Sequence, residues 1–261
     1  MTFHTHDIGP WQLGLGLIFV LMAAGTSFAK SLGLERDIAI GTVRTFAQLF
    51  LMGFVLSFLF AHQSIGFVLG LFIIMVIFAA RIVKGRVKEK DVSFTMPVFW
   101  SMFLGYALVA VMVTGLVVQA KPWWRAEYFI PLGGMVVGNS MTALAICLER
   151  FFSDIRTKRD IIEMKLALGA SMAEASDDIV RDALRSGMIP SINSMMGVGV
   201  VFIPGMMSGQ ILAGADPMIA IRYQIVVMLM LVGSCALTCI LVIHLIRRRT
   251  FGKGQYLCLR P

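Results

Sequence analysis

Long apolar stretches with almost no charged residue constrain the fold of this chain more than any other feature. Of its 261 residues, 58% are hydrophobic, whereas soluble domains contain about 45–50% apolar residues. A helix that crosses a bilayer needs about 20 largely apolar residues, and seven stretches meet this requirement. The sequence therefore predicts an all-helical, polytopic membrane protein that forms a single transmembrane domain over residues 1–261. The seven predicted spans cover residues 11–29, 43–60, 64–80, 96–118, 129–147, 191–213 and 218–245.

Lysine and arginine residues are concentrated in every second loop, and this pattern predicts the orientation of the chain. Cytoplasmic loops of membrane proteins carry an excess of these residues. With the N-terminus outside and the C-terminus cytoplasmic, 20 of the 23 lysines and arginines lie on the cytoplasmic side. The opposite orientation inverts this ratio. The net charge of +8 is thereby explained by membrane insertion, and we expect no binding of nucleic acid.

The one sizeable polar block, residues 149–189, has the pattern of two helices joined by a sharp turn. Gly169 suits the position just after a helix end. Ser171 and Glu174 have the spacing of a capping box, so the second helix should begin at Met172. The block therefore predicts a cytoplasmic helical hairpin between the fifth and sixth spans. This hairpin either rests on the rest of the protein or docks a cytoplasmic partner.

Helix-breaking residues mark the end of this hairpin and the sixth predicted span. Gly187 and Pro190 are expected to end the second hairpin helix. Within the span at 191–213, Pro204 removes a backbone hydrogen bond and predicts a kink near the middle. Membrane helices tolerate such breaks where the segment is buried in protein or lines a cavity. The kink is therefore a candidate part of a substrate pathway.

Polar and sulfur-containing side chains near the kink are candidates for substrate contact. Gln210 carries an amide that needs partners when it is buried. Thioethers suit soft metals such as Cu(I), although packing is the alternative because the chain contains 19 methionines. Asn139 and Ser140 form a polar cluster in the fifth span and are expected to face the kink. The predicted pathway residues are Asn139, Ser140, Pro204, Met206, Met207 and Gln210, and the sequence defines no metal ligand set.

Other small or polar residues have simpler structural explanations. Asp216 and Pro217 suit the N-cap and first position of the last helix. Cys235 and Cys239, four residues apart on that helix, are either thiolate ligands or small packing residues. Glycines four residues apart let helices approach closely, within the chain or in a homodimer. These glycine pairs are Gly66 with Gly70, Gly134 with Gly138, and Gly205 with Gly209.

The chain contains none of the motifs that indicate an enzyme. It has no G-x-x-x-x-G-K-[ST] phosphate loop, no H-E-x-x-H motif and no paired catalytic carboxylates. We therefore expect no enzymatic activity and no cofactor bound by this chain. If ATP drives its function, a separate subunit must hydrolyse the nucleotide.

Two regions of the chain resemble one family of transporters. EMKLALGAS, residues 163–171, is similar to the glutamate-alanine-alanine-glycine coupling motif of ABC-transporter permeases. The runs LALGAS…EA…IPSIN, residues 166–193, and PGMMSGQILAGADP…RYQI, residues 204–225, resemble the FetB-type permease family of ABC transporters. RTFAQL, residues 44–49, extends the likeness to the N-terminal half. The resemblance covers most of the chain.

The resemblance implies a permease in the bacterial inner membrane that acts as a homodimer with two cytoplasmic ATPase subunits. Iron efflux is assigned to one bacterial member of that family, so the expected substrate is a metal ion such as iron. The alternatives are an ABC uptake permease for another small solute, an ATP-independent carrier or channel, and a membrane protein that organises a complex. The implied ATPase-coupling residues are Glu163, Leu168, Gly169, Ala170, Ser171 and Glu174.

Overall fold

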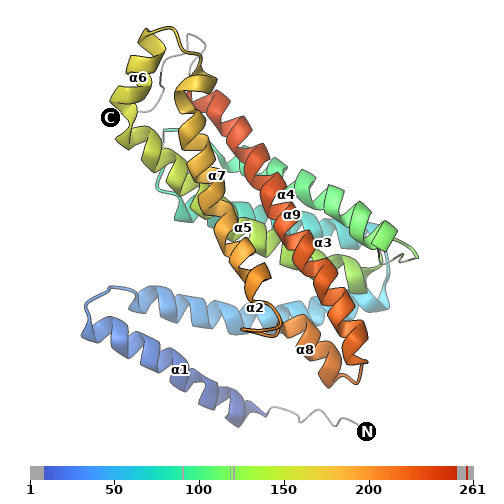
Figure 1. Ribbon diagram of the computed structural model, residues 1–261. Helices are drawn as coiled ribbons and strands as arrows, with labels where there is room; N and C mark the ends of the chain where they lie inside the picture. Colours follow the sequence, from blue (N-terminus) through green and yellow to red (C-terminus); the bar gives the residue numbers. More distant parts are fainter. Residues whose placement is uncertain (1–8, 90, 118, 120, 252–256, 258–261) are drawn as a thin grey trace. The chain divides into compact units, whose positions relative to one another are not determined.

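The computed structural model describes residues 9–89, 91–117, 119, 121–251 and 257, and these residues form nine α-helices and one π-helical segment (Figure 1). The chain divides into two compact units. The first contains the residues up to Gln63 together with Leu212–Gly214, and the second contains Ser64–Ile211 and the chain from Ala215 onward. Each unit is described by itself. The all-helical prediction is confirmed for the described residues.

The first unit is a pair of packed helices, α1 (Pro10–Ala29) and α2 (Glu35–Ala61). Pro10 occupies the first turn of α1, where its missing N–H is not needed. The turn between the helices is fixed by Ser27, whose buried hydroxyl donates to Glu35 Oε1 at 2.7 Å and accepts from the Leu34 N–H at 3.1 Å. These bonds satisfy polar groups that apolar helix faces cannot.

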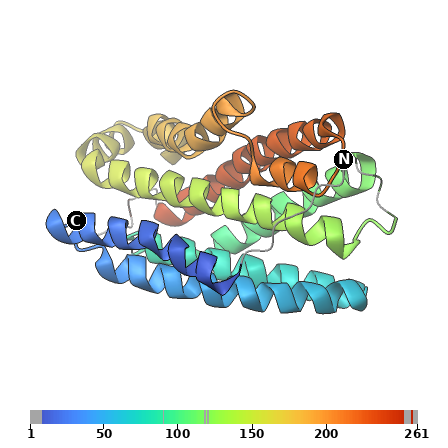
Figure 2. The ribbon, with the colours of Figure 1, turned by 90° about the horizontal axis from the view of Figure 1, so that it is seen from below.

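The second unit is built around α5, which lies between α3 on one side and α7 with α9 on the other (Figure 2). Its core is apolar and aromatic. The Tyr106 hydroxyl donates to the Phe129 carbonyl at 2.7 Å, and both rings pack against Phe72. The helices of this unit are α3 (Ile65–Arg86), α4 (Thr95–Ala110) with the π-helical segment η1 (Val111–Val117), α5 (Ala126–Thr157), α6 (Arg159–Ala167), α7 (Met172–Gly197), α8 (Gly205–Leu212) and α9 (Pro217–Thr250).

Six helical segments among the described residues are long and apolar enough to cross a membrane, and they match six of the seven predicted spans. The chain is thus a multi-pass membrane protein. Several helices extend well beyond the predicted spans. Helix α2 begins at Glu35 instead of residue 43, and α5 continues into the polar block as far as Thr157. Apolar content locates the part of a helix that suits lipid, but it does not locate the end of the helix.

The residues of the predicted kinked helix over 191–213 form parts of two separate helices. Helix α7 passes through Gly187 and Pro190 and ends at Gly197, residues 198–204 are not helical, and α8 begins at Gly205. Gly187 does not end α7 because the glycine packs against α5: an added Cβ would lie 2.8 Å from Cys147 Cβ. The predicted kink at Pro204 is instead a full interruption, after which the chain restarts as a helix.

The hairpin prediction is confirmed at its turn. Gly169 has φ +92°, and α6 ends in a Schellman motif in which the N–H groups of Gly169 and Ala170 donate to Leu166 and Lys165 carbonyls. Helix α7 then begins at Met172, as predicted. The Glu174 N–H donates to Ser171 Oγ, and the Ser171 N–H donates to the Glu174 carboxylate at 2.8 Å. Both ends of this turn are therefore capped.

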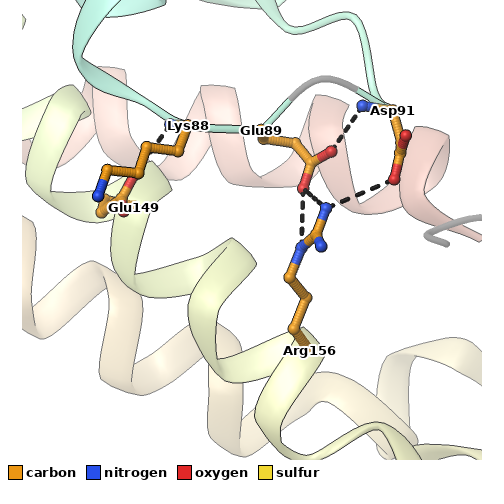
Figure 3. A network of polar contacts seen from close by, with 5 residues as sticks. All are labelled: Lys88, Glu89, Asp91, Glu149 and Arg156. Carbon is orange, nitrogen blue, oxygen red and sulfur yellow. Dashed lines mark hydrogen bonds and ion pairs between the residues drawn. The ribbon is translucent and has the colours of Figure 1, made fainter. Parts of the chain in front are cut away.

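A network of charged groups ties the loop between α3 and α4 to α5 (Figure 3). The side chain of Glu89 is only 1% exposed, and the Arg156 guanidinium donates to Glu89 Oε2 at 3.0 and 3.3 Å. Arg156 also pairs with Asp91, and the Lys88 N–H donates to Glu149 at 3.2 Å. On α9, Arg249 donates to a carbonyl of the same loop. The charged ends of α3, α5 and α9 are thus held together at one end of the unit.

Arg156→Ala is expected to lower the free energy of unfolding by about 2 kcal/mol, because it removes the guanidinium that donates two hydrogen bonds to the buried Glu89 carboxylate. The matched control is Arg181→Ala, whose partner Asp177 is exposed and whose loss should cost less than about 0.5 kcal/mol. Unfolding of the purified protein in detergent measures both. Equal effects for the two variants would contradict a structural role for this network.

Candidate functional site

A pocket of about 420 Å³ lies where α7 is interrupted. Its walls come from the end of α7, the non-helical residues 198–204, α8 and α9. Interrupted membrane helices commonly form the substrate sites of transporters, because the break frees backbone groups and makes room between neighbouring helices. The lining is mostly apolar, with methionines Met195, Met207 and Met228 and a single amide side chain, that of Gln224.

Gln224 gives the pocket its one polar side chain. The residue is 5% exposed, and its Oε1 has no hydrogen-bond partner among the described residues. An unpaired buried acceptor costs about 1–3 kcal/mol, so such a group calls for a reason other than packing. A ligand in the pocket that supplies a donor or a cation would provide one. Sequence reasoning did not select Gln224, although a polar residue in the last apolar span was a signal that could have found it.

The structure brings only one of the predicted pathway residues, Met207, into this pocket. Pro204 and Met206 are close in sequence but do not line it. The Oε1 of Gln210 is buried and has no hydrogen-bond partner in the described part of the chain, yet this residue does not line the pocket either. A helix directs successive side chains about 100° apart, so adjacent positions such as Met206 and Met207 face different surroundings.

Asn139 and Ser140 lie on α5 and are not among the residues that line the pocket. The Asn139 amide donates to Ser191 Oγ at 2.9 Å and to the Leu231 carbonyl at 3.3 Å. It therefore joins α5 to α7 and α9. The hydroxyl of Ser140 is buried and has no partner among the described residues.

These two neighbours are expected to respond in opposite ways to alanine. Asn139→Ala should destabilise the protein by about 1–3 kcal/mol, since it removes the hydrogen bonds that join α5 to Ser191 on α7 and to the Leu231 carbonyl on α9. Ser140→Ala should be neutral or stabilising, because it removes a hydroxyl that pairs with nothing described. Thermal unfolding in detergent compares the two. A loss of transport in a normally folded Ser140→Ala variant would instead show that this hydroxyl contacts substrate.

The cysteines and glycines are placed largely by packing. Cys235 and Cys239 are fully buried, and no group of three or more His, Cys, Asp or Glu among the described residues could hold a metal ion. This favours packing over thiolate ligation. In the predicted glycine pairs, an added Cβ would meet nothing within 4 Å at Gly70, Gly138, Gly205 or Gly209, whereas at Gly134 it would lie 3.3 Å from Met75 Cε and at Gly66 3.8 Å from Ser64 Oγ. Closer approaches occur at Gly105, Gly133 and Gly187, where an added Cβ would come within 2.9 Å of Thr238, Tyr106 and Cys147 respectively. Sequence spacing identified none of these three glycines.

The hairpin forms a second candidate site, and its predicted residues surround one exposed turn. Leu168 is 81% exposed, and Ile161 and Met164 on the same helix are at least half exposed. Ala170 follows Gly169 in the turn and completes the Schellman motif. Glu163 is paired with Arg159 at 2.7 Å, a contact within α6 that supports the helix. The turn thus presents apolar side chains on a charged, well-capped support.

The pH dependence of the cap at this turn follows from Glu174. Its pKa lies below the ordinary value of 4.5, because the Ser171 N–H and hydroxyl donate to its carboxylate. A lowered pKa stabilises the folded cap above about pH 4.5, and this stabilisation is lost as the pH falls through the lower folded-state value. Hydrogen exchange in the first turn of α7, corrected for intrinsic rates, should therefore rise only below about pH 4.5. Glu174→Gln should remove this pH dependence.

A larger pocket of about 720 Å³ lies between α3, α5 and α7. Charged residues Arg86, Glu149 and Arg150 line it together with apolar residues of α3 and α5. Arg150 is already paired with Asp154 at 2.9 Å, and Glu149 accepts from a backbone N–H. Much of the polar lining of this pocket therefore already forms ion pairs or hydrogen bonds within the chain.

Comparison with known proteins confirms the resemblance. The model of UPF0014, described as an uncharacterised protein family, matches residues 10–251. The membrane protein YjkA of Bacillus subtilis is 36% identical over 94% of this chain and 97% of the relative. The probable iron export permease protein FetB of Escherichia coli is 31% identical over 97% and 96%. The protein ALUMINUM SENSITIVE 3 of Arabidopsis thaliana is 32% identical over 92% and 87%. No solved structure matches the chain. The chain belongs to the UPF0014 family of membrane proteins.

Proposed function

We propose that this chain is the membrane-spanning permease subunit of an ABC transporter that exports a metal ion such as iron, driven by a separate ATPase subunit. The observation that carries this proposal is the exposed apolar tip of the hairpin. The name of the Escherichia coli relative, a probable iron export permease, supports the class of substrate.

The hairpin tip has the properties of a docking element. Leu168 is among the most exposed large apolar residues of the described chain, at 81%. Burial in lipid is an unfavourable alternative, since Arg159, Asp160 and Lys165 lie on the same short helix. The turn is also rigid, because the Schellman motif and the capping box satisfy its backbone groups. A preorganised apolar tip loses little entropy when it inserts into a groove of a partner.

The proposed topology places the hairpin in the cytoplasm and the N-terminus outside. Lysine and arginine residues favour this orientation. Helix α7 beyond Pro190, residues 198–204 and α8 together make the sixth of seven crossings in this arrangement. The permease acts as a homodimer with two ATPase subunits in the bacterial inner membrane, and ATP is bound by the partner alone.

Helix α7 supplies a mechanical link between the two sites. It runs unbroken from the capped turn to Gly197, a distance of about 39 Å at 1.5 Å per residue. Its first turn belongs to the hairpin, and Met195 near its end lines the pocket. A shift of the hairpin on ATP binding would therefore move one wall of the pocket. This coupling changes access to the pocket from the two sides of the membrane.

Metal content of a strain that lacks the gene tests the proposal. We expect the strain to accumulate iron relative to its parent, and the wild-type chain to restore the parental level. Elemental analysis should cover iron, manganese, copper and zinc together. Unchanged content of all four metals would contradict metal export. A lowered content of one metal would favour the alternative of an uptake permease.

A further inference from the structure

We infer that the pocket at the interruption of α7 binds a soft, monovalent metal cation such as Cu⁺, through the thioethers of Met195, Met207 and Met228 and the Gln224 amide oxygen. Only the transport of the bound ion across the membrane rests on the proposed function. Binding itself requires neither ATP nor a partner.

The donor set points to a soft ion. Three of the ten residues that line the pocket are methionines, and they come from three separate elements: Met195 from α7, Met207 from α8 and Met228 from α9. Thioether sulfur selects Cu⁺ over harder ions, which prefer oxygen. The sulfurs also sit on flexible side chains with three rotatable bonds, so they can close around an ion in a pocket larger than the ion itself.

Gln224 provides evidence for a ligand that is independent of the methionines. Its Oε1 is buried in the pocket wall without a hydrogen-bond partner among the described residues. A cation satisfies such an acceptor directly. An apolar solute would leave the oxygen unpaired, and the desolvation cost of that oxygen would remain.

The charge of the pocket points to a monovalent ion. No charged side chain lines it, and the cost of moving an ion from water into an apolar environment rises with the square of its charge. Mg²⁺, Ca²⁺ and similar hard ions are held by carboxylates, and the described residues contain no suitable group of three His, Cys, Asp or Glu. A neutral cage of sulfurs and one amide oxygen therefore favours a single positive charge on a weakly hydrated ion.

The alternative for these methionines is ordinary packing, since flexible thioethers fill irregular gaps in many cores. Packing predicts that the three side chains respond to a soft ion no more than other methionines do. Met196 provides the comparison within the chain, because it directly follows Met195, is 75% exposed and does not line the pocket.

Titration of the full-length chain in detergent with Ag⁺, a redox-stable analogue of Cu⁺, tests the site. Methionine methyl groups labelled with ¹³C report binding at individual sulfurs, so that ions bound by cysteines do not obscure the result. Met→Leu substitutions at 195, 196, 207 and 228 assign the signals, and leucine nearly preserves the side-chain volume. We expect the signals of Met195, Met207 and Met228 to shift together with one apparent Kd, and that of Met196 to stay in place.

Substitution of the donors separates coordination from a general effect. Met207→Leu or Met228→Leu should raise this Kd about tenfold or more, and Gln224→Leu should raise it as well. Met196→Leu should leave it unchanged. Zn²⁺ should not shift the three signals. The inference is overturned if the three signals do not move, if all methionines respond alike, or if Zn²⁺ produces the same shifts.

The outcome is independent of the proposed function. If no ATPase binds the hairpin but Ag⁺ shifts the three signals, the site stands and the ABC role fails. If the ATPase binds and the signals do not shift, the proposed ABC role stands and the proposed soft-cation site is wrong. Titration with a short-chain lipid identifies the remaining occupant: shifts of the three methionines with lipid and not with Ag⁺ would overturn the inference.

Discussion

Leu168→Asp is expected to weaken binding of the ATPase subunit about 30-fold or more while leaving the permease folded. Leu168 is 81% exposed, so the change disturbs no internal contact of the described chain. In a docked complex the same position would be buried, and a desolvated, unpaired carboxylate would oppose binding. Loss of a central interface anchor costs about 2 kcal/mol or more, which is about 30-fold in Kd.

The partner is first identified by cross-linking from a Leu168→Cys variant in native membranes, with mass spectrometry of the product. The expected partner carries a G-x-x-x-x-G-K-[ST] sequence, which this chain lacks. Affinity is then measured with the purified subunits. Arg181→Asp serves as control, because it places the same side chain at an exposed position of the same hairpin, about 14 Å along α7 from its first residue, Met172. Equal loss of binding in both variants would contradict docking through the tip.

Gly187→Val is expected to destabilise the permease by about 3 kcal/mol or more. An added Cβ at this position would lie 2.8 Å from Cys147 Cβ and 2.9 Å from the Ala143 carbonyl oxygen. The backbone of α5 cannot move aside as a flexible side chain can, so α7 must separate from α5. Because α7 also joins the hairpin to the pocket, surviving protein should show weakened coupling as well as a lower unfolding temperature.

Gly138→Val is the matched control for this prediction. Gly138 lies on α5, where an added Cβ would meet nothing within 4 Å. Its replacement should change stability by less than about 1 kcal/mol, because a mid-helix glycine itself costs about 0.5–1 kcal/mol. Comparable destabilisation by the two variants would show that the close approach of α5 and α7 is not what Gly187 provides.

Local signals in the sequence predicted the turns and most of the membrane helices. Gly169, Ser171 and Glu174 act within a few residues of each other, and both the helix end and the helix start lie where these residues place them. The apolar runs likewise located six helices that can cross a membrane. The turns depend on local backbone geometry and the spans on apolar content, and a short stretch of sequence specifies both.

Features that depend on tertiary contact were not predictable in this way. Pro190 and Gly187 are helix breakers by propensity, yet α7 continues through both because its packing against α5 and α9 outweighs the local cost. The hydrogen bonds by which Asn139 joins α5 to α7 and α9 could not be read from the sequence either. Gln224 belongs to the candidate site because α9 and residues 198–204 line the same pocket, and this contact is not visible in the sequence. Sequence spacing gives the direction of a side chain on its own helix, but not the neighbour that it meets.

Transport by the reconstituted complex tests the central claim most directly. The permease and its ATPase subunit are placed in vesicles with the cytoplasmic side outward, and uptake of iron and of Cu⁺ into the lumen is measured with and without ATP. We predict that at least one of these metals accumulates only when ATP and both subunits are present, and that Leu168→Asp abolishes the accumulation. Accumulation that persists without ATP or without the ATPase subunit, or none of either metal in an assembled complex that hydrolyses ATP, would contradict the account.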